Sequence, residues 1–327
     1  MLKLDNVTIS YKNVPTVQNF NLDMKEGQIV SLVGESGSGK TTVIRAVLGL
    51  LAGGGKVTEG SITFEGEDLL SYTPEQWRKL RGSDISMIFQ DSGAMMNPTR
   101  KVGKVFTEYI LTHENISKKE AWSKGIAMLE RMRLPSPDNI MESYPFQLSG
   151  GMRQRVVIAI ALACDPKVLI ADEPTTALDV TIQAQILELM QDLQKKLGMA
   201  IIMVTHDLGV IASMCDEIIV MYGGRVCERG TADAIFYHPA HEYTKGLLRS
   251  IPKADNMNEK LIPIGGTPIN LLQMPEGCAF CPRCESAMKI CLKQQPAEFR
   301  VGEDHLASCW MNVKEIYEAQ EGGSNEQ

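Results

Sequence analysis

The sequence lacks any long apolar run, and this absence excludes a helix that spans a membrane. Its longest apolar run, Val156–Cys164, is far short of the roughly 20 residues that a span requires. Asp5 and Asn6 interrupt the apolar core that a signal peptide needs. The sequence also has no excess of basic residues, because its net charge is −7. The charge therefore gives no indication of nucleic-acid binding. We expect a cytoplasmic protein, which other chains hold at the membrane if it works there.

Cysteine is scarce through most of the chain and crowded near its end. Cys164, Cys215 and Cys227 are scattered, and we expect them to be small buried hydrophobes. The other five lie close together: Cys278, Cys281, Cys284, Cys291 and Cys309. In a reducing compartment such a cluster indicates metal more than disulfides. The 327 residues, 44% apolar and 22% charged, otherwise suit a globular protein with a main and a smaller domain.

Strand and helix patterns alternate through the first part of the chain. Apolar and polar residues alternate over Leu2–Tyr11, as in a half-buried strand. The pattern also predicts a β-hairpin formed by Ile218–Tyr222 and Arg225–Glu228. Short apolar runs predict buried strands at 28–33, 168–171 and 200–204, and helical patterns occupy 41–51, 153–163 and 181–197. This βαβ order predicts an α/β fold with a parallel sheet.

The strand signals fade between residues 90 and 148. Residues 101–112 and 118–133 have helical patterns instead. We therefore expect a helical insert in the α/β core, at about 91–152.

The composition of the sequence changes again after about Arg249. Pro, Gly and Asn become frequent over Pro252–Pro275, and the cysteine cluster follows. We expect a main domain over 1–250, and a linker with a small cysteine-rich module over 251–327. Residues 321–327 are expected to be disordered.

A glycine-rich loop joins the apolar run at 28–33 to the helical pattern at 41–51. Its glycines let backbone N–H groups wrap a phosphate chain, to which the helix adds its positive N-terminal end. Lys40 would reach the β- and γ-phosphates, and the Thr41 hydroxyl would ligate Mg²⁺. The expected nucleotide contacts are Gly34, Glu35, Ser36, Gly37, Ser38, Gly39, Lys40, Thr41 and Thr42.

Two carboxylates, Asp172 and Glu173, end the apolar run at 168–171. A solvated acidic pair at the end of a strand is common and by itself says little. With the phosphate loop upstream, we interpret Asp172 as a Mg²⁺ ligand through water. Glu173 would then be the general base that polarises an attacking water.

The sequence predicts a second helix N-terminus that could bind phosphate. It is formed by Ser149, Gly150 and Gly151, which precede a helix predicted to start near Arg153. A serine hydroxyl and free N–H groups at a helix N-terminus make an anion site. The helical insert separates this end from the phosphate loop, so one ATP cannot easily use both within one chain. Two chains packed head to tail would each complete the other's site.

With these motifs, residues 1–250 resemble the ATPases of ABC (ATP-binding cassette) transporters. The resemblance implies an ABC-type P-loop core with a parallel sheet, an antiparallel β subdomain and a helical insert. It also implies ATP and Mg²⁺ as cofactors. The segment Leu148–Gln154 matches the family signature. Its residues expected to face the opposite chain's nucleotide are Ser149, Gly150, Gly151 and Gln154.

The same resemblance implies further roles for single residues. Gln90 matches the glutamine loop, which touches Mg²⁺ and the lytic water and relays to membrane subunits. His206 matches the switch histidine at the γ-phosphate, and Tyr11 matches the aromatic residue that stacks on adenine. Ala177-Leu178-Asp179 matches the loop that crosses the dimer interface.

A narrower resemblance links nearly the whole chain to the oligopeptide, dipeptide and nickel importer branch. It is carried by residues 172–189, by His238–Leu248 with Ser250–Pro252, and by the cysteine module. The branch usually has Asp-Pro and later Leu-Asn-Pro after the glutamine. This chain has Asp91-Ser92 and Met96-Asn97-Pro98 there, which leaves the identity of its membrane partners open.

The branch implies an assembly at the cytoplasmic face of the membrane. Two ATPases, often non-identical, lie beneath two membrane permeases, and an external binding protein delivers the substrate. We expect this chain to pair with a distinct paralogue and to power uptake of dipeptides or oligopeptides. Nickel or another chelate is the alternative cargo. A soluble ABC ATPase is the rival of another class, but the single motif set and acidic balance argue against it.

The cysteine cluster offers more thiols than a four-ligand site needs, and thiolates in that number suit an iron–sulfur cluster or zinc. Similar dipeptide-importer subunits carry a [4Fe–4S] cluster, and the matching positions here are Cys278, Cys284, Cys291 and Cys309. The branch commonly has His where this chain has Cys281. Cys281 therefore replaces a ligand, lies nearby unused, or favours zinc.

Overall fold

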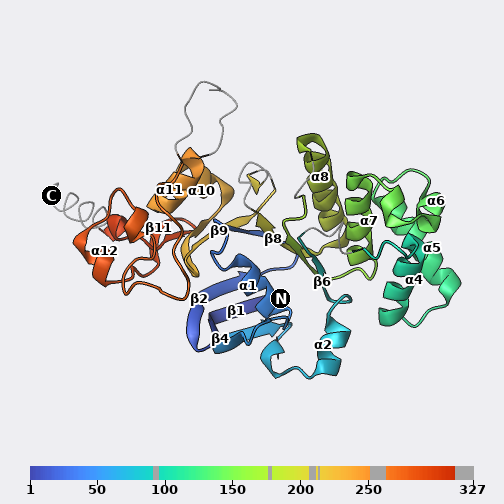
Figure 1. Ribbon diagram of the computed structural model, residues 1–327, viewed down its shortest axis with the longest axis horizontal. Coiled ribbons are helices and arrows are strands. Elements are labelled where there is room, and N and C mark those ends of the chain that lie inside the picture. The colour runs from blue at the N-terminus through green and yellow to red at the C-terminus, as the bar shows by residue number, and fades with distance from the viewer. Residues whose placement is uncertain (91–95, 176–178, 206–210, 213, 251–262, 314–327) are drawn as a thin grey trace. The chain divides into compact units, whose positions relative to one another are not determined.

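The computed structural model describes residues 1–327 except 91–95, 176–178, 206–210, 213, 251–262 and 314–327 (Figure 1). The chain forms two compact units. The first comprises the described residues of 1–23, 30–70 and 205–327, and the second comprises 24–29 and 71–204. The units are therefore not consecutive in sequence.

The first unit contains an antiparallel sheet with the strand order β2-β1-β4-β5. Its strands are β1 (Leu2–Tyr11), β2 (Val14–Met24), β4 (Lys56–Phe64) and β5 (Glu67–Asp68). The predicted strand at Leu2–Tyr11 is confirmed with the same bounds, and Leu2 pairs with Phe64 across the β1–β4 ladder. Buried and exposed residues alternate over Leu2–Asp5, as the sequence pattern predicts, whereas Val7–Ser10 is buried throughout.

The first unit also holds strands in the order β11-β12-β10-β9-β3. Their bounds are β3 (Ile29–Val33), β9 (Glu217–Tyr222), β10 (Arg225–Gly230), β11 (Phe299–Gly302) and β12 (His305–Ala307). The predicted hairpin of β9 and β10 is confirmed. The sheet is mixed rather than parallel throughout, because only β3 and β9 run parallel here. The hairpin β11–β12, which the sequence did not predict, joins the cysteine-rich segment to β10.

The helices of the first unit are short. They are α1 (Lys40–Val47), α10 (Ala232–Tyr237), α11 (Glu242–Arg249), α12 (Lys289–Lys293) and the 3₁₀ turns η1 (Leu69–Ser71) and η3 (Cys281–Arg283). The helix predicted at 41–51 ends at Val47, because Gly49 takes a left-handed φ of 61°.

The second unit has a parallel sheet built from β6 (Ile85–Ile88), β7 (Val168–Asp172) and β8 (Ala200–Thr205). Every residue of β7 and β8 is buried. This burial explains the continuous apolar runs, since parallel strands are covered on both faces. The predicted strands at 168–171 and 200–204 are thereby confirmed.

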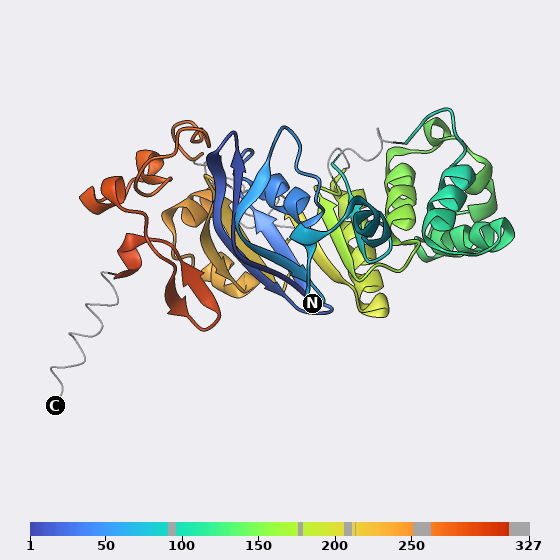
Figure 2. The ribbon, with the colours of Figure 1, turned by 90° about the horizontal axis from the view of Figure 1, so that it is seen from below.

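Helices make up the rest of the second unit, where Figures 1 and 2 both show those of residues 102–162 as a cluster. They are α2 (Pro74–Leu80), α4 (Val102–His113), α5 (Lys118–Arg131), α6 (Pro137–Glu142), η2 (Pro145–Gln147), α7 (Gly150–Leu162) and α8 (Val180–Leu197). The helices predicted at 101–112 and 118–133 are confirmed. Ser117 and Glu120 form a capping box that starts α5.

The three scattered cysteines are free thiols. Cys227 is buried as predicted, whereas Cys164 and Cys215 are half-buried. Burial raises the pKa of Cys164 to about 11 and that of Cys215 to about 12, so both thiols stay protonated at neutral pH.

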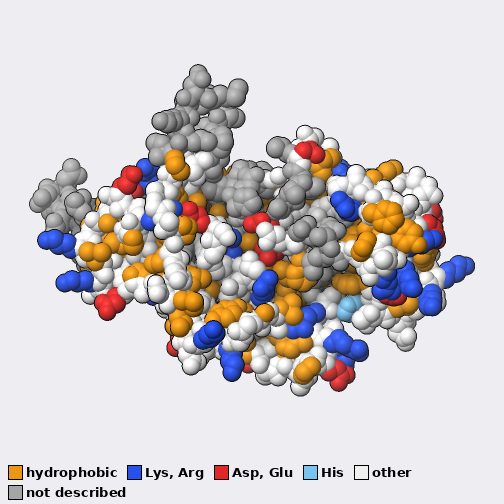
Figure 3. Space-filling view, viewed as in Figure 1, with side chains coloured by type: hydrophobic (Ala, Val, Ile, Leu, Met, Phe, Trp, Pro, Cys, Tyr) orange, Lys and Arg blue, Asp and Glu red, His pale blue; other side chains and the backbone are white. Residues whose placement is uncertain are grey.

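The surface of the described residues mixes both signs of charge. On the face in Figure 3, both Lys or Arg and Asp or Glu side chains occur among hydrophobic and other residues. Among the described helices, none combines the length and apolarity that crossing a bilayer requires.

A buried carboxylate ties β10 to α11 and to β12 in the first unit. Glu228 has no exposed surface. Its Oε1 accepts a hydrogen bond from the Ala240 N–H at 2.7 Å and lies 2.7 Å from His305 Nε2. Its Oε2 accepts from the His241 N–H at 3.0 Å. The side chain of Glu228 is thus the shared partner of three polar groups on these elements.

His241 beside this carboxylate makes the stability of the protein depend on pH. Burial lowers the pKa of His241 from 6.5 to about 4, and its Nδ1 accepts from the Tyr243 N–H at 3.0 Å. Because the folded pKa is depressed, the stabilisation is complete above pH 6.5 and is lost as pH falls toward 4. We expect the free energy of unfolding to fall by about 2 kcal/mol between pH 7 and pH 5 through this group.

The measurement is urea unfolding at several pH values. His241→Asn keeps a side-chain acceptor for the Tyr243 N–H but does not titrate, so its stability should change less over this pH interval. An equal pH dependence in both proteins would contradict the assignment.

Candidate functional site

The phosphate loop lies in the first unit, between β3 and α1. Its glycines take conformations that other residues avoid: Gly34 has φ 150° and Gly39 has φ 104°. A Cβ on Gly34 would lie 2.2 Å from the carbonyl oxygen of Met221, so no side chain fits there. The strand, loop and helix thus occur in the order that the sequence predicted.

Lys40 folds back over this loop. Its ammonium donates hydrogen bonds to the carbonyl oxygens of Gly34 at 2.7 Å and Glu35 at 2.9 Å, and to Ser38 Oγ at 3.2 Å. Lys40 and Ser38 are buried, whereas Ser36 and Gly37 at the tip of the loop are exposed. The charge of Lys40 is therefore held within the loop itself, at the positive end of α1.

The acidic pair lies at the end of β7 in the second unit. Asp172 is 5% exposed, and Glu173 adopts a left-handed φ of 49°. The Glu173 N–H donates to the carbonyl of Val204 at 2.9 Å. Gln90 Nε2 donates to Glu173 Oε2 at 2.9 Å. Parallel pairing of β6 with β7 thus brings together two predicted site residues that are 83 positions apart.

Ser149 is the N-cap of α7, and its hydroxyl accepts from the Met152 N–H at 3.3 Å. The helix begins at Gly150, so the predicted start near Arg153 was wrong. The side-chain cap lets the helix begin directly after the serine, with both glycines in its first turn. Ser149 and Gly150 are exposed, but Gln154 is buried and donates to the Pro174 carbonyl of its own chain. The role of this segment toward an opposite nucleotide stays a prediction.

Several predicted residues lie outside the described part of the chain: His206, Ala177, Leu178, Asp91 and Ser92. Asp179 is described and caps α8 through a hydrogen bond from the Ile182 N–H at 3.0 Å. Tyr11 is half-buried, with its ring so near Gly55 that a Cβ there would lie 2.6 Å from it. Neither observation tests the roles predicted for these residues.

The five clustered cysteines line one small cavity of about 20 Å³ in the first unit, together with Glu242, Phe280 and Trp310 among others. All five are free thiols. Burial raises the pKa of Cys278 and Cys284 to about 11. Within the described residues, no three His, Cys, Asp or Glu side chains lie as a group that could hold a metal ion.

Sequence reasoning missed one contact to the phosphate loop. Arg283 donates to Glu35 at 2.6 and 3.1 Å, and the Glu35 N–H donates to the Tyr243 hydroxyl at 2.7 Å. Arg283 and Glu35 are 248 positions apart. The only signal was an arginine between two cysteines, and no local pattern connects it with a glycine-rich loop.

Comparisons with known proteins agree with this arrangement. The ABC transporter family matches residues 17–176, and the C-terminal region of oligopeptide/dipeptide transporters matches residues 227–291. The chain is 45% identical over 316 residues to the dipeptide transport ATP-binding protein DppD of Bacillus subtilis, covering 95% of this chain and 94% of that protein. It is 46% identical over 305 residues to the oligopeptide transport ATP-binding protein OppD of Escherichia coli, covering 93% and 90%.

Solved structures show the same fold. A dimeric ATP-binding cassette, MJ0796, bound to ADP and Pi has a TM-score of 0.63 and 31% identity, over 71% of this chain and 99% of that chain. CbiO1 from Clostridium perfringens, part of the ABC transporter complex CbiONQ, has a TM-score of 0.64 and 29% identity, over 72% and 90%.

The glycine loop, the acidic pair after β7 and the capped helix α7 thus define an ABC-type ATPase. Within that class, the chain belongs to the family of oligopeptide/dipeptide transporter ATP-binding proteins. The family resemblance noted in the sequence is confirmed along nearly its whole length.

Proposed function

We propose that the protein hydrolyses ATP to power the uptake of dipeptides or oligopeptides across the cytoplasmic membrane. One observation carries this proposal. Relatives named as dipeptide and oligopeptide transport ATP-binding proteins align with 95% and 93% of this chain, including the cysteine-rich part. The nickel or chelate alternative uses the same machinery with another cargo.

The proposed assembly contains four further proteins. Two permeases would form the path through the membrane, and an external binding protein would deliver the peptide. A second ATPase, expected to be a paralogue, would face this one at the cytoplasmic side. The domain boundaries at 1–250 and 251–327 belong to the same proposal.

Within the nucleotide site we assign the following roles. Lys40 and the N–H groups of the phosphate loop bind the triphosphate, and Mg²⁺ is held through Thr41, Gln90 and Asp172. Glu173 activates the attacking water. The Gln90–Glu173 hydrogen bond supports the assignment, because it places the amide against the proposed base. Ser149 of the opposing ATPase completes the γ-phosphate site, with His206 and Tyr11 in the roles given above.

Transport assays separate the cargo classes. Cells that lack this chain should lose uptake of labelled dipeptide or oligopeptide and regain it with the wild-type chain. Co-purification with integral membrane proteins should accompany that recovery. Loss of nickel uptake alone would favour the chelate alternative, and unchanged uptake of both with no membrane partner would contradict an importer.

We further propose that the cysteine-rich segment holds a [4Fe–4S] cluster on Cys278, Cys284, Cys291 and Cys309. A [4Fe–4S] cluster is held by four cysteine thiolates. These four thiols, together with Cys281, line one cavity. A single zinc ion needs four donors around one point, whereas each iron of a cubane takes one thiolate. A zinc ion on the same thiols is the alternative.

Iron analysis tests the cluster directly. Anaerobically purified protein should be brown and contain about four iron atoms per chain, as a [4Fe–4S] cluster requires. Cys278→Ser should lose the colour, whereas Cys164→Ser, far from the cavity in sequence and absent from its lining, should keep it. Cys281→Ser should also stay brown if Cys281 is unused. Colourless protein with stoichiometric zinc would contradict the cluster.

A further inference from the structure

Arg283 connects the cysteine-rich segment to the phosphate loop through a fully used guanidinium group. Its Nη1 and Nη2 donate to the two carboxylate oxygens of Glu35 at 2.6 and 3.1 Å. Nη1 also donates to the Tyr222 hydroxyl at 3.2 Å, and Nη2 to the carbonyl of Ile264 at 3.3 Å. Nε donates to the carbonyl of Gly265 at 2.8 Å. These contacts occupy all of the N–H donors that an arginine has.

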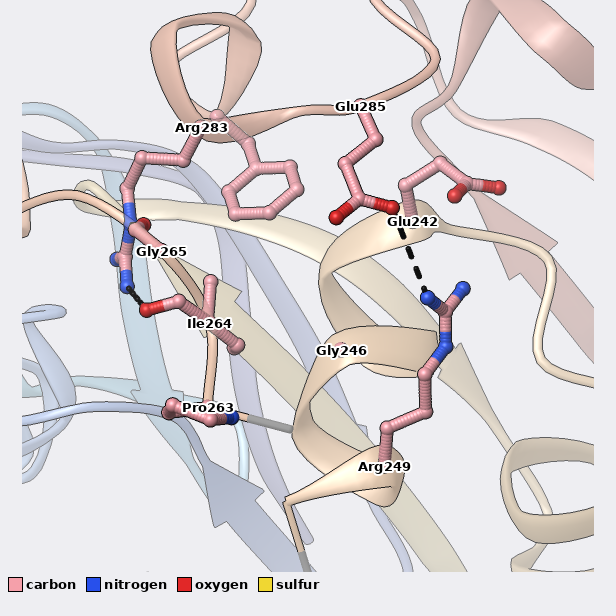
Figure 4. A pocket seen from close by; sticks show the side chains of 9 residues that line it. Glu242, Gly246, Arg249, Pro263, Ile264, Gly265, Arg283 and Glu285 are labelled. Carbon is pink, nitrogen blue, oxygen red and sulfur yellow. Dashed lines mark hydrogen bonds and ion pairs between the residues drawn. The ribbon is translucent and has the colours of Figure 1, made fainter. Parts of the chain in front are cut away.

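The surroundings of the Arg283 side chain fix its orientation. Its side chain is only 4% exposed. Figure 4 shows it beside the Ile264–Gly265 backbone, while Arg249 and Glu285 pair on the other side of a cavity of about 40 Å³. The Glu35 side chain is 27% exposed, so the pair is partly buried, and a bidentate, partly buried ion pair is stronger and more directional than a fully exposed one. The ion pair therefore fixes the position of the Glu35 carboxylate.

An aromatic cluster holds the backbone that carries Arg283. Phe280 is 4% exposed, and its ring centroid lies 5.3 Å from those of both Tyr222 and Tyr243. The Arg283 N–H donates to the carbonyl of Phe280 at 2.9 Å. The Tyr243 hydroxyl in turn accepts a hydrogen bond from the Glu35 N–H. The first loop residue after Gly34 is thus held at both its backbone and its carboxylate by residues from the C-terminal part of the chain.

We propose that Arg283 is a positioning residue of the nucleotide site, which couples the turn between Cys281 and Cys284 to the phosphate loop. The inference rests on the proposed binding of ATP to that loop. Without Arg283, the Glu35 carboxylate is free and uncompensated beside the place where a highly charged triphosphate binds. Like charges at short range in a partly buried site repel strongly, so ATP binding weakens.

The test compares Arg283→Gln with Arg283→Lys and with Arg300→Gln, whose side chain is exposed on β11 of the same segment. For Arg283→Gln we expect about a tenfold rise in the KM for MgATP with kcat within about twofold, since uniform binding is lost. The loss of affinity should be smaller for MgADP and negligible for AMP, because it follows the charge of the phosphate chain. Lys should recover part of the affinity, because it restores charge without the bidentate fork.

The coupling is tested with Cys284→Ser in both backgrounds. It should raise the KM for MgATP in the wild type and raise it no further in Arg283→Gln, because the effect travels through the arginine. Wild-type affinity in Arg283→Gln, an equal loss in Arg300→Gln, an equal loss for AMP, or additive losses with Cys284→Ser would overturn the inference. Failure of the wild-type protein to bind MgATP would instead overturn the proposed function, and this inference with it.

Discussion

Glu173→Gln is expected to stop ATP hydrolysis while leaving ATP binding intact. Glutamine has nearly the same shape but cannot accept a proton from the attacking water. Loss of a general base lowers the rate by about 10²- to 10⁴-fold. Since hydrolysis would normally separate the two ATPases, we also expect the variant to accumulate as an ATP-bound dimer.

Phosphate release and MgATP titration measure the two effects separately. Glu188→Gln is the matched control, because Glu188 is exposed on α8 of the same unit, and it should hydrolyse ATP at the wild-type rate. Normal turnover in Glu173→Gln would remove Glu173 from the mechanism. Loss of ATP binding would instead show that the carboxylate holds the nucleotide.

Glu228→Ala should destabilise the first unit more than any surface change. The substitution leaves the N–H groups of Ala240 and His241 and the ring of His305 without their acceptor in a buried place. Removing one partner of such a buried network costs about 3–5 kcal/mol. Glu228→Gln keeps an acceptor oxygen and should cost less.

Urea unfolding provides the free energies, with Glu303→Ala as the control. Glu303 is exposed and precedes the same β12 strand that carries His305. It should change the free energy of unfolding by no more than about 0.5 kcal/mol. An equally small effect for Glu228→Ala would show that water replaces the lost acceptor and that the network contributes little.

Features that a single segment determines could be predicted from the sequence. The strand Leu2–Tyr11 begins with alternating buried and exposed residues, and β7 and β8 are buried throughout, so each shows its own pattern of apolar residues. The phosphate loop could also be predicted, because its glycines, Lys40 and Thr41 all lie within the continuous segment Gly34–Thr41.

Features that depend on distant segments could not be predicted. The hairpin β11–β12 is short, and its place beside β10 depends on pairing rather than on its own composition. The ion pair between Arg283 and Glu35 joins residues 248 positions apart, and no local sequence pattern connects the two. The start of α7 was misplaced because its two glycines suggested a turn, whereas the Ser149 cap makes them the first helical residues.

Crosslinking across the ATPase pair tests the central claim, that two cassettes enclose ATP with Ser149 of one at the phosphate loop of the other. Ser149→Cys in this chain, in the Glu173→Gln background, and a cysteine introduced in the partner cassette's phosphate loop at the position that matches Ser36 are treated with a short bismaleimide. Glu173→Gln without the added cysteines provides the baseline. We predict a crosslinked dimer that forms with MgATP and not without it. No crosslink above the baseline, or one that forms equally without nucleotide, would contradict the shared site.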